Sequence, residues 1–210
     1  MAYGAPMDLD RRRDAALPAW VRRAALGGVV GPAAFIGGWI TSAVITDRSY
    51  SSIDEAISRL AAVGADTRVL MTAGFIGFGV ALPVYGQALR RAVPGPAWAM
   101  ATLAGVTTLG VAATPLDRSP TVDTLHALLA GIGYVALAAT PLLAARPLLR
   151  SGHLTLARFG LAVGSVSAVS LALASTSLPT GLFQRLGLTG TDAWIVASAI
   201  TIARGRLSCR

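Results

Sequence analysis

Six long apolar runs constrain this chain more than any other feature of its sequence. Most of them reach the roughly 20 residues that an α-helix needs to cross the hydrocarbon core of a bilayer. Lipid offers no partner to an unpaired backbone amide, and the runs lack the alternation of barrel strands, so helices are the predicted form. The sequence therefore predicts an all-α, polytopic membrane helix bundle with six transmembrane helices. These are Ala24–Thr46, Val69–Leu89, Ala97–Pro115, Thr124–Ala145, Phe159–Leu178 and a shorter Gly190–Ala203.

The composition excludes the main soluble classes. The chain is 54% hydrophobic and 13% charged, which is too apolar for a soluble domain of 210 residues. Its net charge of +8 is carried by arginine, but no basic stripe is interleaved with aromatic side chains, so we expect no nucleic-acid partner. Cys209 is the single cysteine, which excludes an intrachain disulfide and CxxC chemistry.

The arginines predict the orientation of the bundle. Most of the 18 basic residues fall at the chain ends and in alternate connections, and the positive-inside rule places that side in the cytoplasm. We therefore expect a multi-pass protein of the cell membrane with both termini cytoplasmic. Residues 1–23 form a cytoplasmic tail, residues 24–204 the membrane domain, and residues 205–210 a second cytoplasmic tail. The arginines left on the outer side are Arg48, Arg59, Arg68, Arg118 and Arg185.

Two outer segments are predicted to form short interfacial helices. In residues 51–64, apolar side chains recur at helical spacing, and Ser52 with Glu55 has the spacing of a capping box. In residues 178–194, glycines interrupt the apolar sequence, which favours a short interfacial or re-entrant helix before the last span.

The densest polar cluster lies between the third and fourth spans. Ser119 and Pro120 predict a helix start, and Asp123 in the first turn complements the helix dipole. His126 follows on the same helix face, just inside the apolar span, where it needs a partner such as Asp123 or Asp117. These three ionisable side chains are the candidate catalytic residues, as an acid/base pair.

The facing loops supply candidate ligand-binding residues, which are Arg185, Glu55, Ser58 and Asp54. Arg185 is expected below the headgroups, paired with an outer carboxylate. The second histidine, His153, falls on the cytoplasmic side, so we expect no zinc site, and no phosphate-binding loop predicts a cofactor. Glycines in the second and fifth spans predict close helix packing within the bundle.

Apart from His126 and Asp192, both expected near the outer rim, the spans contain no acidic or basic side chain. Proton-coupled transporters normally carry such residues near the midplane of the membrane, so this class is not expected.

The sequence resembles the multi-pass bacterial membrane proteins of the domain of unknown function 998 family. The resemblance extends from about Ile36 to Ala203. It rests on YSSIDEAISRLAAVG before the second span, on TPLD, on the histidine that opens the fourth span, and on GLFQRL before Trp194. It implies a helical membrane fold with an unsettled activity. The family's recurring positions are matched by Ser58, Asp117, His126 and Arg185, whereas Arg59 stands where the family often has an acidic residue.

Two functions remain open. The first is a membrane module whose outward-facing polar cluster binds a lipid headgroup, a small amphiphile or a partner. The second is a membrane-embedded enzyme that acts on a lipid or isoprenoid substrate at the outer leaflet by acid/base chemistry, with Arg185 holding an anionic group. The sequence does not predict an oligomeric state.

Overall fold

The computed structural model describes residues 17–176 and 178–209. It is 77% helical and no described residue lies in a strand, which confirms the all-α class. The elements in chain order are α2 (Ala19–Ala24), α3 (Gly27–Ile45), the 3₁₀ helix η1 (Ile57–Ala61), α4 (Arg68–Ala92), α5 (Ala97–Ala113), α6 (Pro120–Arg150), α7 (Leu154–Leu173) and α8 (Thr180–Ala203).

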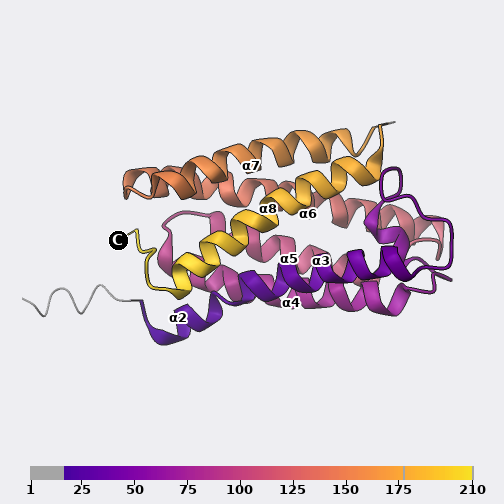
Figure 1. The fold of residues 1–210 in the computed structure, drawn as a ribbon, viewed down its shortest axis with the longest axis horizontal. Helices are drawn as coiled ribbons and strands as arrows, with labels where there is room; N and C mark the ends of the chain where they lie inside the picture. Colours follow the sequence, from indigo (N-terminus) through magenta and orange to yellow (C-terminus); the bar gives the residue numbers. More distant parts are fainter. Residues whose placement is uncertain (1–16, 177, 210) are drawn as a thin grey trace, which may run out of the picture.

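The long helices run up and down as one elongated bundle (Figure 1). From α3 onward each long helix packs against the next one in the chain, and α8 returns to pack against α3. Glycines allow the closest approaches. A Cβ at Gly27 in α3 would lie 2.5 Å from the Ala81 carbonyl of α4, and one at Gly160 in α7 would lie 2.7 Å from Trp194 Nε1 of α8. These glycines therefore allow close helix packing within the bundle.

Two ends of the bundle can be distinguished. At one end α2 lies beside the C-terminal segment (Figure 1). Arg22 Nε donates to the Ala203 carbonyl at 2.8 Å, and Cys209 N donates to the Ala92 carbonyl at 2.9 Å. At the other end lie η1 and the loops around it. We call this second end the loop end.

The helices are suited to a membrane by length and composition. Five helical segments of the described chain are long and apolar enough to cross one, and α2 with α3 counts as a single segment, Ala19–Ile45. The 17-residue α5 is apolar but shorter. Many large apolar side chains are exposed along these helices, as expected where lipid replaces water.

The last predicted outer segment differs from its prediction. Residues 180–203 form one continuous helix, α8, rather than an interfacial helix followed by a shorter span. Its glycines pack instead of interrupting it: a Cβ at Gly187 would lie 2.8 Å from Leu171 Cγ of α7. In lipid a broken helix leaves backbone groups without partners, so close packing of a continuous helix is the better solution. Asp192 therefore lies near the middle of α8, not at the outer rim.

The first outer segment also differs in detail. A turn over residues 52–55 precedes η1, so the predicted α-helix is replaced by a turn and a single 3₁₀ segment. Ile57 and Leu60 are buried and anchor η1, whereas Ile53 is exposed.

Candidate functional site

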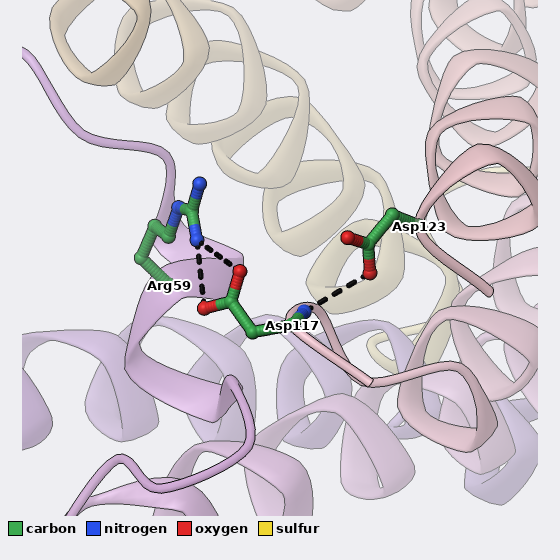
Figure 2. A network of polar contacts seen from close by, with 3 residues as sticks. All are labelled: Arg59, Asp117 and Asp123. Atoms are coloured by element: carbon green, nitrogen blue, oxygen red, sulfur yellow. Dashed lines mark hydrogen bonds and ion pairs between the residues drawn. The ribbon is translucent and has the colours of Figure 1, made fainter. Parts of the chain in front are cut away.

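The turn between α5 and α6 is fixed by its own carboxylates (Figure 2). Asp117 adopts a left-handed backbone conformation, with φ of 63°. Both of its carboxylate oxygens accept from Arg59 Nη1 at 2.8 Å, and its backbone N donates to Asp123 Oδ1 at 3.0 Å. Side chains of Arg59 and Asp117 are 42% and 48% exposed, so this pair contributes about 0–1 kcal/mol. Ser119 accepts from Val122 N at 3.3 Å, which confirms the predicted helix start.

His126 is buried, but the prediction that a carboxylate is its hydrogen-bond partner is wrong. Its Nδ1 lies 2.6 Å from the carbonyl oxygen of Thr114 and makes no hydrogen bond to Asp117 or Asp123. Since a carbonyl only accepts, Nδ1 carries the hydrogen, and in a neutral ring Nε2 is then the acceptor. The two aspartates are engaged by Arg59 and by the turn itself, which explains why they do not reach the ring.

A cavity of about 50 Å³ lies behind this turn, between η1 and helices α3, α4, α5, α6 and α8. Ser58 and His126 both line it, and within the described chain neither Ser58 Oγ nor His126 Nε2 has a hydrogen-bond partner. Tyr134 and Gln184 line it too; Gln184 Nε2 donates to the Tyr134 hydroxyl, and Gln184 Oε1 accepts from Ile57 N at 2.7 Å. Sites for drug-sized ligands measure about 300–1,000 Å³, so this cavity suits water or a small polar group.

Asp54 and Glu55 stabilise their own loop. Ser51 Oγ donates to Asp54 Oδ2 at 2.6 Å, and Ser51 N donates to Glu55 Oε1 at 3.0 Å. The predicted capping box of Ser52 and Glu55 is therefore wrong: Glu55 accepts from Ser51 N, and the segment forms a turn instead of a capped helix. Neither carboxylate lines the cavity.

Arg185 is held by carbonyl oxygens. Its Nη1 donates to the carbonyls of Ser52, Glu55 and Gly181 at 2.7, 3.1 and 3.0 Å, and its Nη2 donates to the Tyr50 hydroxyl. No carboxylate of the described residues pairs with it, so the predicted ion pair is wrong. The carbonyls contact the guanidinium because Gly181 has no side chain, so the Ser52–Glu55 loop packs directly on α8.

Aromatic rings complete the surroundings of this cation. The guanidinium carbon lies 5.0 Å from the centre of the Trp39 ring and 5.7 Å from that of Tyr50. Burial raises the pKa of the Tyr50 hydroxyl above its ordinary value, although the charge of Arg185 acts in the opposite direction. Tyr50 therefore stays a neutral phenol and does not cancel the charge of Arg185.

A long apolar groove begins beside Arg185. It has a volume of about 780 Å³ and lies between α3, α7 and α8. Trp39 and Arg185 line it together with aliphatic side chains such as Ile36, Val166 and Leu186. Its size and lining fit an extended hydrocarbon chain.

Comparison with known proteins gives one match. A family model described as Protein of unknown function (DUF998) matches residues 29–201, most of the chain. The chain belongs to this family. No curated protein and no solved structure matches it.

The four residues on which the family resemblance was based lie in three different places. Ser58 and His126 share the small cavity, Asp117 pairs with Arg59 in the turn, and Arg185 lies beside the groove. Arg59, which was expected to differ from the family pattern, pairs with Asp117. The candidate residues thus gather at the loop end without forming one cluster.

Sequence reasoning missed four contributing side chains, which are Trp39, Tyr50, Tyr134 and Gln184. Tyr50 and Gln184 stand within the motifs YSSIDEAISRLAAVG and GLFQRL, so the signal for them was present in those motifs. Trp39 and Tyr134 lie inside apolar spans, where an aromatic residue gives no pattern of its own. Among the described residues no group of three His, Cys, Asp or Glu side chains could hold a metal ion.

Proposed function

We propose that this member of the DUF998 family is a six-span protein of the cell membrane that binds an anionic amphiphile at its outer end. The headgroup would lie at Arg185 and the hydrocarbon chain in the groove between α3, α7 and α8. A lipid or a small amphiphile of the membrane has this chemistry.

The six spans and their orientation are supported by lengths and by the arginines. At about 1.5 Å per residue, the 17 residues of α5 rise about 25 Å, near the lower limit for crossing a bilayer. An even number of spans agrees with α2 and the C-terminal segment lying at one end. The connections at that end carry most of the arginines, which favours the cytoplasm for it and the outer surface for the loop end.

One observation carries the binding proposal: a cation that no described carboxylate neutralises lies at the edge of an apolar groove. Charges are costly at this depth and are usually paired. The carbonyls and aromatic rings solvate Arg185 but leave its charge uncancelled, so an anionic group is the complementary ligand. The groove, unlike the cavity at His126, has room for the rest of an amphiphile.

The enzyme hypothesis receives no comparable support. Acid/base chemistry would need His126 and a carboxylate at a common cavity. His126 lines a cavity, but Asp117 and Asp123 do not.

Mass spectrometry of lipids that co-purify with the detergent-solubilised protein tests the binding proposal. We expect the amount of anionic lipid that co-purifies with Arg185→Gln to be lower than in the wild type by about tenfold or more. The reason is that hydrogen bonds to charged groups contribute about 1.5–3 kcal/mol. Arg59→Gln is the matched control, because Arg59 is an arginine at the same end that already has a carboxylate partner. It should retain the lipid.

A second variant tests the groove without changing the contacts between Arg185 and the loop. Ala193 is exposed and lines the groove, so Ala193→Phe fills the groove without touching Arg185. It should also lose the lipid. Equal amounts of the same anionic lipid in the wild type, Arg185→Gln and Ala193→Phe would contradict the proposal.

A further inference from the structure

Asp192 is the most isolated ionisable group of the described chain. It lies near the middle of α8, is 1% exposed, and neither carboxylate oxygen has a hydrogen-bond partner among the described residues. The hydroxyls of Thr191 and Ser198, which lie on α8 with Asp192, are engaged elsewhere. Thr191 donates to the carbonyls of Gly187 and Leu188, and Ser198 pairs with the Tyr85 hydroxyl at 2.6 Å.

The helices that pack against α8 offer no counter-charge. No ionisable side chain occurs in α3. In α2, Arg22 donates to Ala203; in α4, Tyr85 is bonded to Ser198; in η1, Arg59 pairs with Asp117. The other ionisable groups of these helices are arginines at or near helix ends, Asp123 in the first turn of α6, and the already bonded His126 and Tyr134. These arginines are Arg23, Arg68, Arg90, Arg91, Arg146, Arg150 and Arg158.

We propose that Asp192 is a proton-binding site at the centre of the bundle, occupied by a proton in the packing described here. An ionised carboxylate without a partner is far more costly in an apolar interior than a neutral carboxylic acid, so the geometry accommodates only the acid. The site goes beyond amphiphile binding and does not depend on it.

The proposal has a structural consequence. Loss of the proton would leave a charge with no partner, so water must enter or α8 must shift before the carboxylate can form. Proton-coupled transporters were not expected from the sequence, because Asp192 was expected at the outer rim. Its position near the middle of the continuous α8 removes that objection.

Infrared spectroscopy of the purified protein at neutral pH tests this site directly. Wild type should show the carbonyl band of a protonated carboxylic acid. Asp192→Asn, which has nearly the same shape and no proton to bind, should lack that band. Asp123→Asn is the matched control: this aspartate accepts a hydrogen bond near the surface, and its replacement should leave the band in place.

The pH dependence of the folding stability tests the same site independently of the infrared spectrum. The unfolded chain releases the proton of an aspartate above about pH 4, so a folded state that keeps it loses stability as the pH rises. The stability of the wild type relative to Asp192→Asn should therefore fall as the pH rises above about 4. Absence of the band from the wild type, its persistence in Asp192→Asn, or a stability difference independent of pH would overturn the proposal.

Discussion

Arg185 and Asp192 lie about two turns apart on the same helix but have opposite polar surroundings. Carbonyls, a phenol and two aromatic rings surround the guanidinium, whereas the carboxylate has no polar neighbour within bonding distance. The sequence predicted Arg185 below the headgroups and Asp192 near the outer rim. It could not show the partners of Arg185, because carbonyl oxygens are present at every residue and only the folded loop decides which of them converge.

Gly181 provides a test at the scale of one residue. A Cβ there would lie 2.5 Å from the Ser52 carbonyl oxygen and 2.7 Å from Arg185 Nη1. We expect Gly181→Ala to push the loop off α8 and to destabilise the protein by about 1–3 kcal/mol, the usual range for overpacking. Thermal unfolding in detergent measures this.

Gly131→Ala is the matched control for that substitution. Gly131 also lies within a helix, but a Cβ there meets nothing within 4 Å. This variant should be neutral or slightly stabilised, because alanine favours helices over glycine. Equal stability of the two variants would show that the loop does not rest on Gly181 as described.

The start of one helix was predicted correctly, whereas the continuity of another was not. The start of α6 at Ser119 and Pro120 was correct because a cap and a helix-start proline act locally. The continuous α8 was missed because Gly181, Gly187 and Gly190 read as interruptions in an isolated segment. These glycines allow α7 and the Ser52–Glu55 loop to pack closely against α8. A local sequence pattern does not show such contacts between distant segments.

Asp66 provides a test at the scale of two elements, because it joins the end of α3 to the start of α4. Its carboxylate accepts from Thr46 Oγ1 at 2.8 Å and from Asp47 N at 2.7 Å. The hydrogen bond from Asp47 N, followed by that from Thr46, lowers the pKa of Asp66 below its ordinary 3.8. A carboxylate whose pKa is lowered in the folded state stabilises that state at any pH above its pKa in the unfolded chain. This stabilisation is lost as the pH falls through its pKa in the folded state.

We therefore expect Asp66→Asn to be less stable than the wild type at neutral pH and the difference to shrink below about pH 4. Thermal unfolding across a pH series measures it. Asp47→Asn is the control, because within the described chain the Asp47 carboxylate makes no hydrogen bond. A difference for Asp66→Asn that stays constant into acid, or an equal pH dependence in the control, would contradict the role given to Asp66.

At the scale of the whole molecule, apolar runs of membrane length were enough to predict an all-α bundle, and the structure confirms that class. They were not enough to predict the site. The polar residues singled out in the sequence do lie at one end, yet they are divided among a turn, a cavity and a groove. That division depends on how η1 sits between helices distant in the sequence, which spacing along the chain does not encode.

The orientation of the bundle decides whether the Arg185 groove meets the outer leaflet, and cysteine labelling measures that orientation directly. Since Cys209 is the single cysteine, Cys209→Ser gives a background for Ser49→Cys at the loop end and Ser151→Cys at the other end. Both serines are exposed. In sealed right-side-out vesicles, a membrane-impermeant maleimide should label Ser49→Cys at once and Ser151→Cys only after permeabilisation. The reverse order, or equal labelling of both before permeabilisation, would contradict a membrane-spanning bundle with its Arg185 end outside.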